Sequence, residues 1–227
     1  MGLNIYVGWD SREEIAFEVC KQSIIENASI EVDVAPIILD ELISEGVYSR
    51  EIDPLASTEF TYSRFLTPFL NNFSGWALFC DCDFLFLGDV AELLKYKDKN
   101  KALYCVHHEY VPKEGTKMDG QKQTLYPRKN WSSFMFFNCE HSSTRKLTKD
   151  LVSKETGAFL HRMKWAEDSE IGELPTDWNW LEGWNDKPEK GYPKAVHYTR
   201  GGPWFQNYQD VAYADVWKSY AKKIGKK

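Results

Sequence analysis

The sequence predicts an α/β protein in which helices flank a mostly parallel central sheet. The apolar run Leu3–Val7 and the alternating apolar residues of Glu31–Leu39 enclose a segment with helical spacing, and in this strand–helix–strand order the strands are expected to lie parallel. A third run, Trp76–Cys80, is apolar on both faces, as expected for a fully covered strand. With 227 residues and 43% hydrophobic content the chain can bury one core, so we expect a single domain over residues 1–227.

The first helix is expected to begin at a capping box. Ser11–Glu14 has the S-x-x-E pattern, in which the serine and glutamate side chains satisfy free N–H groups at a helix start. The apolar residues that follow define its core face: Ile15, Ala16, Val19, Cys20 and Ile24. Asp10 follows the first strand, and parallel sheets bind ligands beyond the carboxyl ends of their strands. Asp10 is therefore a candidate site residue.

The remaining elements follow from shorter patterns. Further strands are expected at Ala102–Val106, Ser133–Phe137 and Ala195–Tyr198, and further helices at Tyr62–Leu70, Ser143–Lys154 and Asp210–Lys227. Glu109–Asn130 is polar and contains Gly and Pro residues, which indicates a long functional loop. Trp165–Trp184 has no clear periodicity and is expected to be irregular.

Charge, cysteine content and hydropathy narrow the class of protein. The net charge of −6 argues against a general nucleic-acid binder. Five scattered cysteines form neither a disulfide framework nor a zinc pattern, so we expect reduced, mostly buried thiols. No apolar run is long enough to cross a bilayer, and the first residues have the pattern of a strand rather than a signal peptide. We therefore expect a cytoplasmic protein, in which the lysines of Lys218–Lys227 allow only a weak membrane-surface contact.

Asp81 and Asp83 are the strongest candidates for chemistry. If the strand Trp76–Cys80 continues through them, both carboxylates share one face while Cys82 points into the packing. Two carboxylates this close need a cation, and oxygen ligands favour Mn²⁺ or Mg²⁺, with Mn²⁺ preferred if an imidazole joins them. The alternative is a solvated turn at a strand end. The apolar runs on both sides of the pair favour a ligand site.

Several sequence blocks spread over most of the chain carry a resemblance to a known family. They are Asn4–Asp10, Tyr62–Phe65, Leu78–Asp83, Ser132–Asn138, Leu174–Asn179 and His197–Trp204. In this order they resemble the family 8 glycosyltransferases, which have the GT-A (Rossmann-like) fold and a DxD motif. The DxD block and the final block are the specific ones. The resemblance implies a metal-dependent enzyme that uses a nucleotide-sugar donor.

The resemblance also implies a set of donor-binding residues. They are Val7, Gly8, Asp10, Arg64, Asp81, Cys82, Asp83, Ser132, Ser133, His197, Arg200 and Gly201. Within this set, Asp81, Asp83 and His197 are implied to hold the metal. Asp10 is implied to contact the uracil, and the two serines to line the sugar pocket.

The implied catalytic residues are Arg64, Arg200 and Asp168. Cleavage of the sugar–phosphate bond leaves negative charge on UDP, which the cation and the two arginines would stabilise. The family usually has a lysine directly before Pro-Trp, where this chain has Gly202, so the positive charge is expected from Arg200 instead. Asp168 resembles an acidic position near the sugar and is the candidate carboxylate beneath it; a surface acid is the alternative.

The implied reaction is transfer of a hexose-type sugar from a UDP-sugar of the UDP-glucose or UDP-galactose class to a glycan or another hydroxyl acceptor. The resemblance implies retention of the anomeric configuration, and leaves open front-side attack or a covalent intermediate.

Two other functions compete with this one. A metal-dependent nucleotidyltransferase would need a glycine-rich basic loop after the first strand, which Gly8–Arg12 matches poorly. A non-catalytic sugar-binding module would explain the 15% aromatic content but needs no paired carboxylates. Some residues suit acceptor or sugar binding, although solvent exposure is the favoured explanation for the two histidines and core packing for at least one or two of the tryptophans: His107, His108, Trp178, Trp180 and Trp184.

Overall fold

The computed structural model describes residues 2–54, 56–109, 128–188 and 190–225. Within these ranges, the main sheet has the strand order β2-β1-β3-β6-β5-β7. Its strands are β1 (Leu3–Gly8), β2 (Val32–Ile37), β3 (Trp76–Cys80), β5 (Leu103–Val106), β6 (Phe134–Asn138) and β7 (Ile171–Leu174). β1 is parallel to β2 and β3, and β5 is parallel to β7, whereas β6 runs antiparallel to its neighbours. The predicted mostly parallel sheet is confirmed.

A second, smaller sheet has the order β4-β9-β8. Its strands are β4 (Phe84–Phe86), β8 (Trp180–Leu181) and β9 (Ala195–His197). The α-helices are α1 (Glu14–Asn27), α2 (Leu39–Ser44), α3 (Thr67–Leu70), α4 (Lys149–Lys154), α5 (Gly157–His161) and α6 (Ala214–Lys223). Short 3-10 helices span Ser63–Leu66, Val90–Tyr96, Trp131–Ser133, Thr144–Lys146, Asp168–Glu170, Thr176–Asn179 and Gln206–Tyr208.

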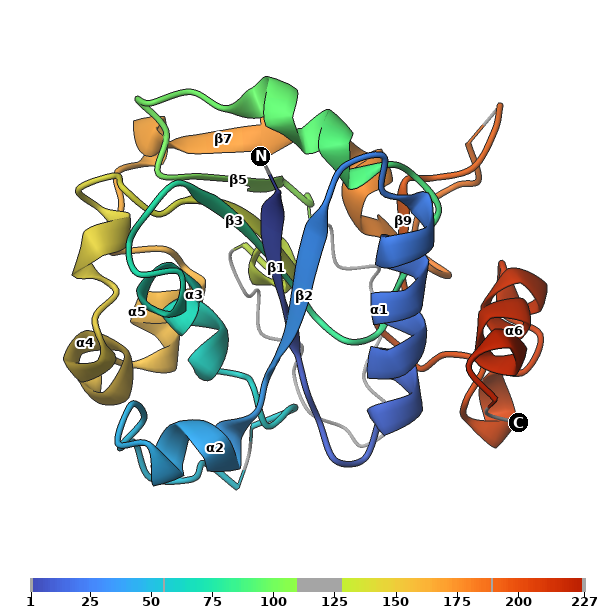
Figure 1. Ribbon diagram of the computed structural model, residues 1–227, viewed down its shortest axis with the longest axis horizontal. Helices are drawn as coiled ribbons and strands as arrows, with labels where there is room; N and C mark the ends of the chain where they lie inside the picture. The colour runs from blue at the N-terminus through green and yellow to red at the C-terminus, as the bar shows by residue number, and fades with distance from the viewer. Residues whose placement is uncertain (1, 55, 110–127, 189, 226–227) are drawn as a thin grey trace.

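Helices lie on both sides of the sheet (Figure 1). α1 and α6 lie on one side of β1, β2 and β3, and α3, α4 and α5 lie on the other. α1 is buried on two faces, because Cys20 packs in the main core while Val19 packs in a second cluster with Val196 and Trp217. The small sheet therefore lies against α1 and α6, next to the carboxyl end of β3.

The predicted capping box of the first helix is wrong. α1 begins at Glu14, and Glu13 precedes it without a side-chain capping bond. The Ser11 hydroxyl instead donates to Glu59 Oε1 at 2.5 Å, because the loop 57–60 lies across the end of β1. The core face of the helix is confirmed for Ala16, Val19, Cys20 and Ile24, which are buried.

Two expectations about the strands are also wrong. Trp165–Trp184 is not irregular, because it contributes the edge strand β7 and the short strand β8. β3 does not continue through Asp81 and Asp83; a turn follows Cys80 and leads into β4, which belongs to the other sheet. The chain changes direction at this turn, which contains Asp81 and Asp83. The geometry of the turn therefore determines how close the two carboxylates lie to each other.

Two predicted helices are each divided. Ser63–Leu66 is 3-10 and is followed by α3, where Pro68 has no N–H for a regular helical bond. The segment 143–154 breaks before α4, where the Leu151 N–H donates to the hydroxyl of the capping residue Thr148. All five cysteines are buried and unpaired, as expected.

Two further features concern membranes and the lysine-rich end. No helix among the described residues combines the length and the apolar character that a membrane span requires. Within α6 and its end, Lys223 contacts Glu26 at 2.5 Å and Lys218 donates to Gln209 O. Lys226 and Lys227 lie outside the described residues, as does most of the predicted loop Glu109–Asn130.

Candidate active site

The carboxyl end of β3 places Asp81 and Asp83. Cys80 pairs with Phe134 in the antiparallel β3–β6 ladder, and the Asp81 N–H continues that ladder by donating to Ser133 O at 3.0 Å. The chain then turns at Cys82 and Asp83 and enters β4. The turn, rather than strand alternation, therefore brings the two carboxylates to one place.

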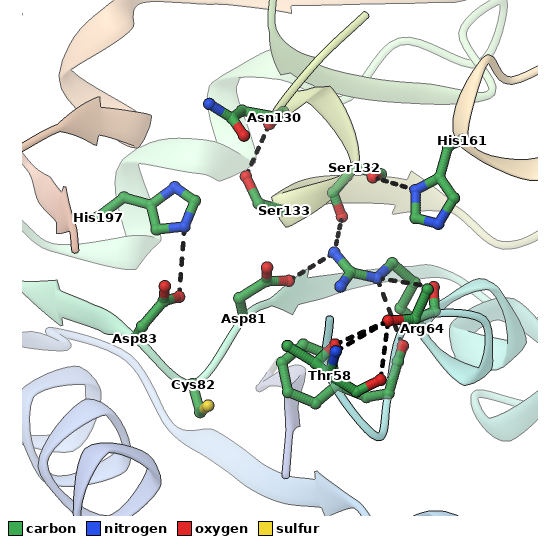
Figure 2. Close-up of polar contacts among 12 residues, drawn as sticks. Thr58, Arg64, Asp81, Cys82, Asp83, Asn130, Ser132, Ser133, His161 and His197 are labelled. Atoms are coloured by element: carbon green, nitrogen blue, oxygen red, sulfur yellow. Dashed lines mark hydrogen bonds and ion pairs between the residues drawn. The ribbon is translucent and has the colours of Figure 1, made fainter. Parts of the chain in front are cut away.

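His197 reaches the same place through the small sheet. Phe84 and His197 are directly opposed in the antiparallel β4–β9 pair, and the Tyr198 N–H donates to Asp83 O at 3.0 Å. His197 Nε2 lies 3.3 Å from Asp83 Oδ1 (Figure 2). One ligand atom from each of Asp81, Asp83 and His197 lies within 4.8 Å of the others. The structure brings these three residues together, and their role as metal ligands stays a prediction.

A hydrogen-bond network fixes the tautomer of His197. Asn179 Nδ2 donates to Asn130 O at 3.1 Å and to Ser133 Oγ at 3.0 Å. Because the Asn130 carbonyl can only accept a hydrogen bond, the side-chain nitrogen of Asn179, and not its oxygen, must face it. Asn179 Oδ1, 2.8 Å from His197 Nδ1, must then accept a hydrogen bond from the Nδ1–H group. The lone pair of a neutral His197 is consequently on Nε2, and it faces Asp83.

These atoms suit a cation. Asp83 Oδ1 is buried and has no hydrogen-bond donor among the described residues, even though His197 Nε2 is close. Two acceptor atoms that face each other repel, and a divalent cation between them would remove that repulsion. Carboxylate oxygens with one imidazole nitrogen, held by a second hydrogen-bonded residue, are a donor set that suits Mn²⁺. The residues present therefore fit a divalent metal ion.

Arg64 is held beside the metal-ligand candidates. It is 5% exposed, and its Nη1 donates to Asp81 Oδ1 at 2.7 Å and to Ser132 O at 3.0 Å. The guanidinium also lies 5.3 Å from the centre of the Phe79 ring. Burial raises the pKa of Asp81, and the charge of Arg64 opposes that rise. Arg64 thus compensates one carboxylate charge and keeps a fixed positive charge at the site.

Ser132 and Ser133 hold other residues of the site in place through hydrogen bonds. Both are buried, and the Ser132 hydroxyl lies 2.8 Å from Nδ1 of His161. Burial, with the nearby charge of Arg64, lowers the pKa of His161 to about 3, so this histidine is neutral. Neither serine lines the two cavities described below. They hold Arg64 and Asn179 in place, and their predicted contact with the sugar stays a prediction.

Asp10 is buried and fully engaged within the protein. Its two carboxylate oxygens accept from the Arg12 side chain at 2.8 and 2.6 Å, from the Arg12 N–H at 3.0 Å and from the Glu59 N–H at 3.2 Å. Burial would raise the pKa of Asp10, but these hydrogen bonds outweigh it and lower the pKa. Asp10 therefore orders the loop after β1, and its contact with uracil stays a prediction.

Three other residues of the predicted donor set are packed in the interior. Val7 is 0% exposed and Cys82 2%, and in Figure 2 the Cys82 thiol points away from Asp81 and Asp83. A side-chain carbon at Gly8 would lie 2.4 Å from the Phe60 ring, so only glycine fits there. These residues shape the site through the backbone.

A cavity of about 320 Å³ opens above the carboxylates, and we call it the carboxylate cavity. Its lining includes Glu13, Asp81, Asp83 and His197, together with the loop 198–205. Burial, and then the charge of Asp83, raise the pKa of Glu13 to about 7. The cavity therefore contains one more carboxylate than the sequence predicts.

A second cavity of about 550 Å³ adjoins the first, and we call it the neighbouring cavity. The two share Asn130, Thr199 and Arg200 in their linings. The neighbouring cavity is also lined by His107, His108, Lys129 and the half-exposed Trp184, whereas Trp178 and Trp180 are buried in the cores. Only Trp184 among the three tryptophans can therefore contact a ligand here.

Arg200 stands between the two cavities. Its Nη2 lies 3.0 Å from Glu182 Oε2, and Glu182 is buried. The guanidinium crosses Gly183, where a side-chain carbon would lie 1.6 Å from Arg200 Nη2. Gly201, which follows, has φ +123, a conformation that glycine adopts readily. The missing side chain of Gly183 and the buried carboxylate of Glu182 fix the position of Arg200.

Asp168 is not brought to either cavity. Its side chain is 84% exposed and lies 2.5 Å from Arg128 Nη2. It precedes β7, at the amino end of that strand, while Asp81 follows the carboxyl end of β3. The predicted role of Asp168 beneath the sugar stays a prediction.

The sequence did not indicate Glu13, Asn179, His161 or Glu182 as site residues. Asn179 ends one of the blocks that resemble the glycosyltransferase family, so that block offered a signal. Glu13 lies inside the predicted capping box Ser11–Glu14, directly before α1, but it is not one of the two capping positions of that pattern. His161 and Glu182 have no sequence signal, because their roles depend on contacts that only the fold creates.

Comparisons with known proteins agree with this architecture. No protein-family model matches the sequence. Protein CDI of Arabidopsis thaliana is 52% identical over 225 residues, which cover 98% of this chain and 87% of that protein. The solved structure of the apo glycosyltransferase GlyE of Streptococcus pneumoniae matches with a TM-score of 0.64 and 14% identity, over 97% of this chain. This chain spans only 60% of the GlyE chain.

Two further structures cover their chains more fully. The galactosyltransferase LgtC, in complex with donor and acceptor sugar analogues, matches with a TM-score of 0.62 and 12% identity, over 97% of this chain and 96% of its own. Mouse xyloside xylosyltransferase 1 matches with a TM-score of 0.56 and 10% identity, over 88% and 98%. At these identities the likeness concerns the fold, and the predicted GT-A fold is confirmed.

Proposed function

This chain belongs to the family of Protein CDI, and from its GT-A fold and its site we propose that it is a metal-dependent glycosyltransferase. The donor is a UDP-sugar of the UDP-glucose or UDP-galactose class, and the acceptor is a glycan or another hydroxyl compound. The anomeric configuration is retained. A cytoplasmic location and a single domain stay predictions.

The observation that carries this proposal is the group formed by Asp81, Asp83 and His197. A buried carboxylate oxygen without a donor faces an imidazole whose lone pair is directed by Asn179. A sugar-binding module has no use for such an arrangement. A nucleotidyltransferase would need a basic loop after β1, whereas here the acidic side chain of Glu13 lines the cavity.

The metal ion, the two arginines and the neighbouring cavity have separate roles in the proposed reaction. The divalent ion, Mn²⁺ or alternatively Mg²⁺, supplies positive charge for the leaving diphosphate. Arg64 holds Asp81 and adds a fixed charge, and Arg200 adds a second one at the wall between the cavities. Because the leaving group is stabilised by charge, no side chain has to donate a proton to it. We assign the acceptor to the neighbouring cavity, where Trp184 offers an aromatic face to a sugar ring.

UDP is expected to bind tightly only with a divalent cation. Without it, the diphosphate meets the uncompensated carboxylates of the carboxylate cavity. Calorimetric titration with UDP in Mn²⁺ should give an affinity at least roughly tenfold higher than in EDTA. Equal affinities under both conditions would remove the metal from the proposal.

Gly183→Ala is expected to impair transfer by moving Arg200. The new side-chain carbon would take the place of Nη2, and the loss of this cation from the diphosphate should raise the barrier by about 2–4 kcal/mol. The matched control is Gly191→Ala, because Gly191 has nearly the same φ, +75 against +74, but nothing within 4 Å. Both variants should lose similar stability. Similar transfer rates in the two variants, measured in single turnover, would contradict the role of Arg200.

A further inference from the structure

Glu13 is the charged residue of the carboxylate cavity that the proposed chemistry does not use. It directly precedes α1, and its side chain lines the cavity together with Asp81 and Asp83. Its carboxylate lies 3.9 Å from the thiol of Cys82, which stands between Asp81 and Asp83 in the sequence, and its backbone N–H donates to Asp10 O at 2.9 Å. Glu13 therefore links the turn of the metal-ligand candidates to the loop after β1.

The carboxylate of Glu13 has few hydrogen-bond or ionic partners among the described residues. Among the described residues it forms no ion pair, and its one hydrogen-bond contact is a weak one from the Cys82 thiol at 3.9 Å. Arg12, a cation whose charge acts on Glu13, is already bound to Asp10. Asp81, which lines the same cavity, is compensated by Arg64. Glu13 thus contributes an acceptor to the cavity without a matching donor.

Glu13 is also not part of the metal-ligand group. The ligand atoms that gather within 4.8 Å belong to Asp81, Asp83 and His197, and Glu13 is not among them. A negative charge outside that group repels a diphosphate. In a cavity that binds a nucleotide, the Glu13 carboxylate favours binding only if the nucleotide donates hydrogen bonds to it. The parts of a nucleoside diphosphate that offer donors without negative charge are the ribose hydroxyls and the base.

We propose that Glu13 accepts a hydrogen bond from the ribose hydroxyls of the nucleoside diphosphate and so selects ribonucleotides over deoxyribonucleotides. This inference rests on the proposed function, because it requires a nucleotide in the carboxylate cavity. The ribose joins the diphosphate to the base, and Glu13 lies on the path from the metal-ligand group to the end of β1, where the base is predicted. A vicinal diol is a good partner for a carboxylate, since each hydroxyl donates to one of its oxygens.

The test compares the binding of UDP, 2′-deoxy-UDP and inorganic pyrophosphate in Mn²⁺ by calorimetry. The wild-type protein should bind UDP roughly tenfold more tightly than 2′-deoxy-UDP, as expected for a hydrogen bond to a charged group. Glu13→Gln removes the charge and one of the two acceptor oxygens, so it should lower that ratio and leave pyrophosphate binding unchanged or slightly stronger. The matched control is Glu14→Gln, which removes a charge from the exposed neighbouring position of α1 and should keep the wild-type ratio.

Each outcome separates the inference from the function on which it rests. If UDP binds but Glu13→Gln keeps the wild-type ratio, the ribose assignment is wrong and the proposed function stands. If Glu13→Gln weakens the binding of pyrophosphate as much as the binding of UDP, Glu13 contributes to metal binding rather than to ribose binding. If the wild-type protein binds no UDP with Mn²⁺, both the function and the ribose assignment are overturned. Melting temperatures check folding, and Glu13 forms no side-chain capping bond that its replacement would remove.

Discussion

Asp83→Asn is expected to keep the fold and to lose almost all sugar transfer. The amide has nearly the size of the carboxylate but lacks the charge that holds a cation against His197, whose Nε2 lies 3.3 Å from Asp83 Oδ1. Substitutions in the outer shell of metal sites already cost about 10–100-fold, so loss of a direct ligand should lower the single-turnover rate by at least roughly 100-fold. Removal of a buried, uncompensated charge should not lower the melting temperature of the metal-free protein.

Two further Asp→Asn variants complete this experiment. Asp150→Asn changes an exposed acid in the first turn of α4 and should transfer at the wild-type rate. Asp168→Asn tests the predicted nucleophile, since an amide cannot form a glycosyl ester. Because Asp168 is exposed and paired with Arg128, we expect substantial activity, which would favour front-side attack. Wild-type transfer by Asp83→Asn would contradict the assignment of the whole site.

Arg64→Ala is expected to give the largest loss of stability. Arg64 is the buried cation that compensates Asp81, whose side chain is 14% exposed, and removal of one partner of a fully buried pair typically costs about 3–5 kcal/mol, which is therefore an upper bound here. It would also free the carbonyl of Ser132, which accepts from Arg64 at 3.0 Å. Urea denaturation in EDTA, at a pH where Asp81 would otherwise be ionised, measures the effect.

The control for Arg64→Ala is an exposed pair of the same type. Lys95 lies 3.8 Å from Glu92 with both side chains exposed, so Lys95→Ala should change stability by less than about 1 kcal/mol. Arg64→Lys should recover part of the stability because it restores the charge without the second hydrogen bond. An Arg64→Ala variant as stable as Lys95→Ala would mean that Asp81 is compensated in another way.

The sequence predicts the first three strands of the main sheet better than its far edge. β3 follows from a continuous apolar run, because a strand covered on both sides needs hydrophobic residues on both faces, and the edge strand β2 follows from alternating apolar residues. β7 could not be predicted in this way. It is a four-residue edge strand in which Glu173 is exposed and Gly172 makes room for the Tyr104 ring, so its pattern resembles that of a loop.

The site, too, could be predicted from the sequence only in part. Asp81, Asp83 and His197 were predicted from motif spacing and resemblance, and the structure brings them together. The reason for their approach, a turn between two sheets, was not predicted, because a register such as Phe84 opposite His197 depends on long-range pairing. The capping box failed for a similar reason: Glu59, distant in sequence, binds the Ser11 hydroxyl and competes with the helix end.

A screen of nucleotide sugars with Mn²⁺ tests the central claim most directly. The full chain is incubated with UDP-, GDP- and other nucleotide sugars and a panel of glycan acceptors, and release of the nucleoside diphosphate is measured. We predict that UDP is released from a UDP-hexose, that EDTA stops the release, and that excess Mn²⁺ restores it. Release that is unaffected by EDTA, or no release from any nucleotide sugar by the folded protein, would contradict a metal-dependent glycosyltransferase.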